Sequence, residues 1–432
     1  MTGHLLHNDM HAAPPYAVSG HGVWITDSEG KQYLDGCSGA IVSAIGHGHP
    51  RVVEAIREQA GAITFAHRAA FTTHALVELA DRLCAFTGYD AAWFVGSGSE
   101  ATEAAIQFAV QFHREQGEPG RTWFLSFRRG YHGNTLGGLS LSGNARRGAV
   151  ATLVHDFPSL PEPYAYREQG SRTEEQWTRD MLTESRALFE QYGDRLAGIV
   201  LEPVGGATMG ATVPPIAYLQ GLRALCDEYG VLFIADEVMT GMGRCGTPMA
   251  AEHFGIEPDI GVMGKGLGAG YTPIAATLLS ARVRDALLAG TARILGGHTY
   301  AGNPLSAATA LAVLDVIESE GVIDNGVQMG ERLAAGLAEL EASSEIVGDA
   351  RGLGMLRAIE LVTDKSSRAL PQPQGSMAQK LSVAAKDQGL VVYPTTGGVN
   401  DAVVIAPPLT ITAGEVDVLL EKLSAALSAC AR

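Results

Sequence analysis

Short apolar runs alternate with amphipathic stretches along most of the chain. The runs are bounded by glycine, proline or charge, and they predict buried strands at 91–95, 122–127, 196–201, 231–235, 259–263 and 274–279. Between the strands, apolar residues recur at helical spacing, as in Ala101, Ala105, Phe108, Ala109 and Phe112. Strands that alternate with helices favour an open α/β fold.

Both ends of the chain show a different pattern. Residues 22–35 form two short alternating runs around a Ser-Glu-Gly turn, which predicts a β-hairpin. Toward the C-terminus, short strands are mixed with short helices, and the clearest strands are 358–361 and 402–406. Thr412 and Glu415 make a capping box before a final amphipathic helix. These patterns predict a second, smaller α+β domain.

The pattern divides the chain into three segments. We expect a large domain over residues 51–310, and a small domain that combines residues 1–50 with residues 311–432. A chain of 432 residues with 46% apolar residues can bury a core of this size. Residues 158–176, rich in Pro, Glu, Arg and Gln, are expected to form a solvated surface connection.

Composition argues against two classes of partner. The formal net charge of -16 repels phosphate backbones, so nucleic acid is not an expected partner. No apolar segment approaches the roughly 20 residues that a membrane helix needs. Residues 1–15 carry no secretory signal. We therefore expect a cytoplasmic protein that does not bind membranes.

The cysteines and histidines do not form a metal-binding pattern. The five cysteines are scattered and lack CxxC spacing, which indicates neither a disulfide framework nor a zinc site. His4, His7 and His11 are spaced like one helical face. Chain termini are usually loose, however, and a metal site needs ordered supporting groups. We expect no metal site.

The residues that suggest chemistry are concentrated between Val231 and Lys265. Asp236 directly follows a buried strand, where a carboxylate is costly to desolvate unless it faces a positive partner. Lys265 follows the next strand among glycines. Taken singly, a turn-capping acid and a solvated loop lysine are the commoner explanations. Because the carboxyl ends of strands in an open sheet meet in one crevice, together they predict a shared pocket. Such a pair suits pyridoxal phosphate, which needs an amine for its Schiff base and an anion for its ring nitrogen.

A glycine-rich turn at residues 96–101 predicts a phosphate site. Ser97 and Glu100 form a capping box, so a helix is expected to begin here with free N–H groups that point outward. The turn also fits the loose dinucleotide pattern G-x-G-x-x-A. The next strand, however, ends in two arginines and not in the acid that a ribose needs. NAD is therefore disfavoured, and an NADP-dependent oxidoreductase stays open as an alternative.

Two further residues follow strands that we expect to end at the same crevice. Tyr131 follows strand 122–127, and its ring can stack on a flat heteroaromatic cofactor. Glu202 follows strand 196–201, where a capping role is as common as a cofactor role. Both positions are compatible with one pocket.

With these features placed, the chain resembles the class III aminotransferases over nearly its whole length. The resemblance rests on the order and spacing of nine short runs: Gly46–Pro50, Ser97–Ala101, Tyr131–Gly133, Glu202–Val204, Asp236–Val238, Gly241–Arg244, Gly264–Gly266, His298–Tyr300 and Pro407–Leu409. It implies a pyridoxal-phosphate enzyme of fold type I, with a mostly parallel seven-stranded sheet in the large domain. The pattern is most similar to that of the ω-amino acid and amine:pyruvate transaminases.

The resemblance implies two catalytic residues. Lys265 would form the Schiff base with the cofactor and then, once released by substrate, carry the proton between substrate and cofactor. Asp236 would hold the ring nitrogen protonated.

It also implies a cofactor-binding set. Gly98 and Ser99 would bind the phosphate, while Tyr131 and Val238 would pack on the two ring faces. His132 and Glu202 would complete the site. Thr299 would reach the phosphate of a neighbouring subunit, so the active unit would be a homodimer, or a tetramer built from it.

Several departures from the family pattern concern the substrate. An arginine common in 4-aminobutyrate and ornithine enzymes is replaced by Val404, and the acid that pairs with it by Ala207. Asn134 stands where 4-aminobutyrate enzymes have a second arginine. Met239 replaces a glutamine that faces the cofactor hydroxyl. Without these carboxylate clamps, the pocket should suit a neutral or amine-bearing donor.

The expected reaction is transfer of an amino group from a primary amine or ω-amino compound to a small 2-oxo acid, with pyruvate as the expected acceptor. Arg68, Arg128 and Arg351 are candidates for binding the acceptor carboxylate. A racemase or aminomutase on the same fold, the NADP-dependent oxidoreductase and a non-catalytic pyridoxal-phosphate binder remain as alternatives.

Overall fold

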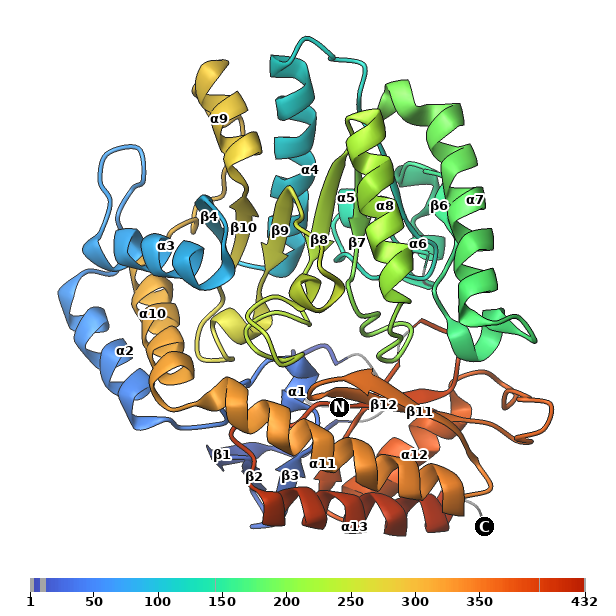
Figure 1. Cartoon of the computed structure of the whole chain (residues 1–432). Coiled ribbons are helices and arrows are strands. Elements are labelled where there is room, and N and C mark those ends of the chain that lie inside the picture. Colours follow the sequence, from blue (N-terminus) through green and yellow to red (C-terminus); the bar gives the residue numbers. More distant parts are fainter. Residues whose placement is uncertain (1–3, 8–12, 144, 396, 431–432) are drawn as a thin grey trace.

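The computed structural model describes residues 4–7, 13–143, 145–395 and 397–430. A seven-stranded sheet with the order β4-β10-β9-β8-β7-β5-β6 is the centre of the larger part (Figure 1). Neighbouring strands are parallel, except that β10 is antiparallel to both β9 and β4. The strands are β4 (Ala91–Val95), β5 (Trp123–Phe127), β6 (Ser159–Leu160), β7 (Leu196–Leu201), β8 (Leu232–Asp236), β9 (Ile260–Met263) and β10 (Ala275–Leu279). The predicted mostly parallel sheet of seven strands is confirmed.

Helices cover both faces of this sheet, which explains why its central strands are apolar throughout. On one face, α4 (Gly98–Glu115) packs Phe108 into the same apolar cluster as Ile234 of β8. On the other face, α7 (Glu174–Tyr192) and α8 (Ile216–Tyr229) pack around Phe233. Each fully buried side chain of this kind stabilises the fold by about 1.5–3 kcal/mol. The sheet is therefore a rigid base for the loops at its edge.

Several further helices surround the sheet or connect it to the smaller part. In particular, α10 packs against α2 and α3. The helices are α1 (Ser38–Ile41), α2 (Pro50–Ala62), α3 (His74–Thr87), α5 (Leu136–Ser140), α6 (Ala145–Ala149), α9 (Ala281–Ala289) and α10 (Pro304–Ser319). As expected from the sequence, the Asn303 side chain caps α10 and Pro304 is its first residue.

The smaller part combines the two ends of the chain, as predicted, in two four-stranded sheets (Figure 1). In the first sheet, the C-terminal strand β13 pairs in parallel with the N-terminal strand β3. The first sheet contains β1 (Ala17–His21), β2 (Trp24–Asp27), β3 (Gln32–Asp35) and β13 (Leu390–Val391). The second contains β11 (Val347–Leu353), β12 (Leu356–Leu361), β15 (Ala402–Ile405) and β14 (Tyr393–Pro394).

Three helices, α11 (Val322–Ser343), α12 (Ser376–Asp387) and α13 (Ala413–Cys430), complete the smaller part. The predicted capping box of the last helix is confirmed, because Glu415 Oε2 accepts from the Thr412 N–H at 2.9 Å and the Glu415 N–H donates to Thr412 Oγ1 at 3.4 Å. The domain limits at 50/51 and 310/311 stay a prediction. Helix α10 continues across the second of them.

Two local predictions are wrong in part. Residues 158–176 are not solvated throughout: residues 170–176 are exposed, but the segment also contains β6 and the fully buried Tyr164. The exposed polar residues give the segment its surface-like composition. The Ser97–Glu100 capping box is only half formed: Ser97 Oγ accepts from the Glu100 N–H, but Glu100 Oε2 accepts from the Gly96 N–H at 2.6 Å. The glutamate therefore fixes the turn before the helix.

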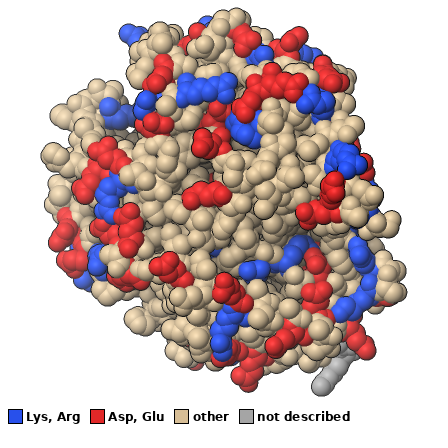
Figure 2. All heavy atoms as spheres, viewed as in Figure 1, with Lys and Arg blue, Asp and Glu red and all other residues tan. Residues whose placement is uncertain are grey.

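On the face shown in Figure 2, acidic and basic side chains are interspersed, and a central area is largely uncharged. Across the described ranges, no helix combines the length and apolar character needed to cross a bilayer. In the same part of the chain, no group of His, Cys, Asp and Glu is placed like a set of metal ligands. His11 lies outside the described residues, and all five cysteines are unpaired.

Candidate active site

The predicted site residues come together at the carboxyl edge of the large sheet, with one exception. A cavity of about 160 Å³ lies where α4 begins and where β5, β7, β8 and β9 end. It is lined by Ser97, Gly98, Ser99, Thr102, Tyr131, His132, Gly133, Glu202, Asp236, Val238, Met239 and Lys265. The exception is Thr299, which lies between α9 and α10, is exposed and does not line this cavity.

Lys265 supplies the amine of the pocket. It follows β9 in a left-handed backbone conformation (φ 42°), which is strained for a residue with a Cβ atom. Its amine makes no hydrogen bond or ion pair with another described residue. Burial disfavours the ammonium form and lowers its pKa to about 8, although the charges of Glu202 and Asp236 act in the opposite direction. A useful fraction of this lysine is therefore a neutral, nucleophilic amine near neutral pH.

Asp236 is held by a buried histidine. Its Oδ2 accepts from His132 Nδ1 at 2.8 Å, and its Oδ1 accepts from the Val238 N–H at 3.2 Å. Burial opposes a charge on His132, but the hydrogen bond and the negative charge of Asp236 outweigh it, so the pKa of His132 is raised. His132 Nε2 is buried and has no partner among the described residues. The carboxylate is thus fixed in direction and kept next to a proton donor.

Glu202 shapes the pocket because its side chain accepts hydrogen bonds from two backbone N–H groups. Its Oε2 accepts from the Tyr131 N–H at 3.0 Å and its Oε1 from the Gly206 N–H at 3.0 Å. Burial raises its pKa to about 7. The glutamate therefore positions the Tyr131 loop and the turn after β7.

The N-terminus of α4 forms an anion cradle. The first N–H groups of a helix lack intrahelical partners, and here they belong to Gly98 and Ser99 on the pocket wall. A Cβ atom on Gly133 would lie 2.6 Å from Ser99 Oγ, and one on Gly98 would lie 3.2 Å from Val238 Cγ1. Only glycine lets these three segments approach so closely. Thr102, one turn further along α4, also lines the pocket, and the sequence analysis missed it.

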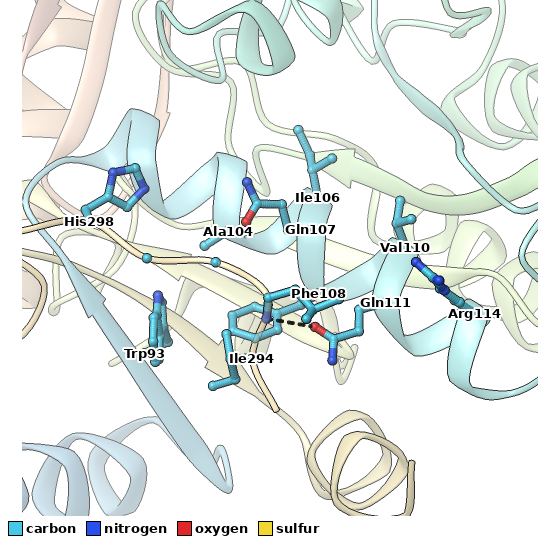
Figure 3. Close-up of a pocket in the computed structure, with 13 residues that line it drawn as sticks. Trp93, Ala104, Ile106, Gln107, Phe108, Val110, Gln111, Arg114, Ile294 and His298 are labelled. Atoms are coloured by element: carbon cyan, nitrogen blue, oxygen red, sulfur yellow. Dashed lines mark hydrogen bonds between the residues drawn. The ribbon is translucent and has the colours of Figure 1, made fainter. Parts of the chain in front are cut away.

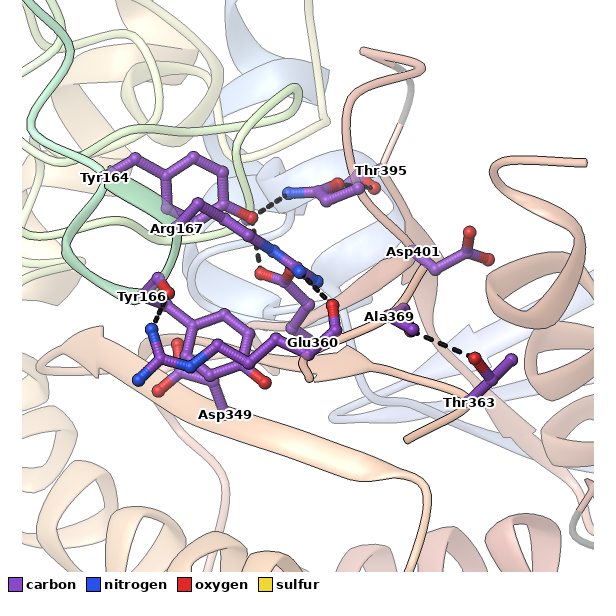
Figure 4. A network of polar contacts seen from close by, with 12 residues as sticks. Tyr164, Tyr166, Arg167, Asp349, Glu360, Thr363, Ala369, Thr395 and Asp401 are labelled. Carbon is purple, nitrogen blue, oxygen red and sulfur yellow. Dashed lines mark hydrogen bonds and ion pairs between the residues drawn. The ribbon is translucent and has the colours of Figure 1, made fainter. Parts of the chain in front are cut away.

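The three arginine candidates differ in availability. Arg351 is buried in a polar network with Glu360 and Tyr164, part of which is seen in Figure 4, and each of its nitrogens donates to a partner. Arg68 donates to the Gly296 carbonyl at 3.1 Å and stacks on Trp93. Arg128 is exposed and does not line the pocket. The structure brings none of them into the Lys265 pocket.

A second cavity, of about 260 Å³, lies outside the Lys265 pocket (Figure 3). The outer face of α4, Trp93 and residues 294–298 line it. His298, next to Thr299, approaches Glu100 with 3.5 Å between Nδ1 and Oε1. The segment that carries Thr299 therefore lies near the start of α4.

The positions that depart from the family pattern are mostly apolar. Val404 and Ala207 are both buried in one apolar cluster, together with Met239. Met239 also lines the pocket, as its position predicted. The exposed Asn134 donates its N–H to Ser99 Oγ at 3.2 Å.

Comparison with known proteins decides the family. The sequence profile described as Aminotransferase class-III matches residues 7–427. The chain belongs to the class III aminotransferases. Among its relatives is the uncharacterized aminotransferase YodT of Bacillus subtilis, 39% identical over 99% of this chain and 98% of YodT. Membership shows that the chain is a pyridoxal-phosphate-dependent aminotransferase, and it removes the oxidoreductase and the non-catalytic binder as alternatives.

Solved structures of transaminases show the same fold. The chain is similar to a thermostable (S)-enantioselective ω-transaminase from Thermomicrobium roseum, with a TM-score of 0.93 and 34% identity over 100% of this chain and 97% of that one. It is also similar to an amine transaminase from an uncultivated Pseudomonas species in its PLP-bound form, with a TM-score of 0.91 and 33% identity over 100% and 98% of the chains. The fold of this class III aminotransferase is therefore fold type I.

These relatives imply pyridoxal phosphate, and the residues of this class III aminotransferase fit it. The pocket offers the Lys265 amine, to which no described residue is hydrogen-bonded, a carboxylate at Asp236 and N–H groups at the start of α4. A ring between Tyr131 and Val238 would meet one flat and one apolar wall. The amine, the carboxylate and the N–H groups therefore match the aldehyde, the ring nitrogen and the phosphate of the cofactor.

Proposed function

We propose that this enzyme transfers an amino group from a primary amine or ω-amino compound to a small 2-oxo acid, with pyruvate as the expected acceptor and pyridoxal phosphate as cofactor. The observation that carries the proposal is the Lys265 amine, which has no partner among the described residues, in one pocket with Asp236 and the α4 N-terminus. Pyridoxal phosphate has a use for all three groups.

Each residue has a defined task in this reaction. When bound, pyridoxal phosphate supplies an aldehyde that takes up the amino group and a ring that accepts an electron pair. Lys265 would hold the cofactor covalently and, once displaced, would carry the proton through its Nζ. Asp236 would keep a proton at the ring nitrogen, and His132 keeps Asp236 in place. Gly98, Ser99, Tyr131 and Val238 all line the pocket. The first two would hold the phosphate, and the other two would enclose the ring.

The donor preference is inferred from two departures from the family pattern. Val404 and Ala207, both buried in one apolar cluster, stand at the positions where 4-aminobutyrate and ornithine enzymes commonly carry an arginine and the acid that pairs with it. A buried apolar pair cannot balance a second carboxylate on the donor, because an unpaired charge there is costly. The likeness to the (S)-enantioselective ω-transaminase supports the same preference.

A donor screen tests the proposal. The absorbance of bound cofactor is followed after addition of 1-phenylethylamine, 5-aminopentanoate or L-glutamate, without an acceptor. 1-Phenylethylamine has no carboxylate and 5-aminopentanoate has only a distant one. Both should convert the cofactor at least about tenfold faster than glutamate, because one carboxylate of glutamate would lack a charged partner. Rapid conversion by glutamate alone would contradict the donor assignment. Turnover without any 2-oxo acid would instead favour the racemase or aminomutase alternative.

We further propose that the active unit is a homodimer, or a tetramer built from such dimers, in which Thr299 completes the site of the other chain. Thr299 is exposed and apart from its own pocket, and the neighbouring Leu295 and Tyr300 expose large apolar surfaces. Such surface is typical of an interface between chains. A cytoplasmic location and the absence of nucleic-acid partners stay predictions.

Mixed oligomers test the shared site. Lys265→Ala chains and Thr299→Ala chains, co-expressed with different tags, form heterodimers in which one site keeps an intact Lys265 and an intact Thr299. Activity should rise above that of either parent, toward about a quarter of the wild-type value for random pairing. Isolated heterodimers that are no more active than the Thr299→Ala parent would show that Thr299 does not act across an interface.

A further inference from the structure

We propose that Arg146 binds the carboxylate of the 2-oxo acid acceptor at the mouth of the pocket. This inference rests on the proposed transaminase function and adds the residue that recognises its second substrate. Arg146 carries no sequence signal of its own, because it lies on the short exposed helix α6.

The position of Arg146 is set by Tyr131. Arg146 belongs to α6, and its guanidinium carbon lies 5.5 Å from the centre of the Tyr131 ring. Its Nη1 donates to Tyr131 Oη at 3.3 Å and to Asn134 Oδ1 at 3.4 Å. Tyr131 lines the Lys265 pocket, and the Asn134 N–H binds Ser99 Oγ of the anion cradle. The guanidinium is therefore one side chain away from the cofactor wall.

The contacts that Nη1 makes there are weak and easily exchanged. Both acceptors are neutral oxygens, and both distances are at the long end of hydrogen bonding. A carboxylate accepts two parallel N–H groups from a guanidinium in charge-assisted bonds that are about twice as strong as neutral ones. An incoming oxo acid can therefore take the place of Asn134 and Tyr131 as the partner of Arg146.

Two of the other candidate arginines are committed elsewhere. Arg351 donates from every nitrogen to its polar network, and Arg68 stacks on Trp93 and donates to the Gly296 carbonyl. The neighbour of Arg146 in sequence, Arg147, pairs with Asp156 at 2.7 Å. Arg147 thus has the same charge on the same helix but contacts a different part of the surface, which makes it a matched control.

An exposed arginine that binds the acceptor would also explain how the site accepts two unlike substrates. A donor without a carboxylate leaves Arg146 on Asn134. An acceptor brings its own negative charge and engages the guanidinium. Arg146 therefore acts on the acceptor and not on such a donor.

The test compares acceptors with and without a carboxylate. Arg146→Met, Arg146→Lys and Arg147→Met holoenzymes are assayed with pyruvate and with butanal, using one amine donor. Arg146→Met should lower kcat/KM for pyruvate by about 10- to 100-fold, mainly through KM, as expected for one lost charge-assisted contact. Butanal turnover should change less than about threefold, Arg146→Lys should restore part of the loss, and Arg147→Met should resemble wild type.

A binding measurement separates this inference from the proposed function. Propanoate has the carboxylate but no reactive carbonyl, and calorimetry should show its affinity for the holoenzyme falling about 10-fold or more in Arg146→Met alone. Equal losses with pyruvate and butanal, or unchanged propanoate affinity, would overturn the role of Arg146 while leaving amine conversion intact. If the wild type fails to convert its cofactor with any amine, the proposed function falls and this inference falls with it.

Discussion

Replacement of Lys265 by alanine is expected to abolish turnover and to remove the visible absorbance of lysine-bound cofactor. The amine of Lys265 has no other partner among the described residues, and its pKa of about 8 suits both attachment and proton transfer. Because one group performs both tasks, the rate should fall by about 10⁴-fold or more, the upper range for loss of a general acid–base group. Single-turnover kinetics with an amine donor measure this loss.

The matched control is Lys386→Ala, which removes an exposed lysine in the last turn of α12. It should keep wild-type absorbance and turnover. Thermal unfolding of both variants shows whether the fold is intact. A Lys265→Ala protein that is folded and still fully active would reject the cofactor assignment as a whole.

For Asp236→Asn, we expect the cofactor to remain bound while the conversion by an amine donor slows by about 10²- to 10⁴-fold. An amide cannot balance a protonated ring nitrogen, so the ring accepts the electron pair poorly. The amide also weakens the hold on His132, whose Nδ1 now donates to a carboxylate at 2.8 Å. Cofactor content is measured after denaturation, and the half-reaction by stopped-flow absorbance.

The neighbouring Glu237 provides a contrast, because its buried carboxylate accepts from the Ala250 and Ala251 N–H groups at 3.0 and 2.8 Å and does not line the pocket. Glu237→Gln should destabilise the fold by about 1–3 kcal/mol, the cost of leaving such a group poorly paired, and leave the half-reaction rate near wild type. If both variants slow the half-reaction equally, Asp236 has no special role at the ring.

The sequence predicts the positions of Asp236 and Lys265 because both follow strongly apolar runs, and a buried strand leaves few ways to place the residue after it. The pairing of Asp236 with His132 could not be predicted in this way. Asp236 is the last residue of β8 and His132 follows β5, and β7 separates these two strands in the sheet, so their contact depends on strand order and loop direction. The periodicity of the sequence gives no information on strand order or on loop direction.

Other differences have local causes. Glu100 was expected to reach back to Ser97, but the turn brings the Gly96 N–H closer to its carboxylate. Tyr164 was hidden in a polar stretch, because Glu360 and Asn400, which bind its hydroxyl group, come from the far end of the chain. Short-range patterns cannot show partners that only tertiary folding supplies.

The cofactor-facing residues and the acceptor-facing residues lie on parts of the chain that differ in how freely they can change. The cofactor-facing residues lie at the ends of buried strands, where a shift of the backbone would disturb the core. Asn134 and Arg146 belong to the connection after β5, both exposed, with buried Leu139 between them. Surface connections tolerate substitution and changes of length. Libraries limited to the exposed positions 134 and 146 can therefore redirect this enzyme to new acceptors while its catalytic machinery is inherited unchanged.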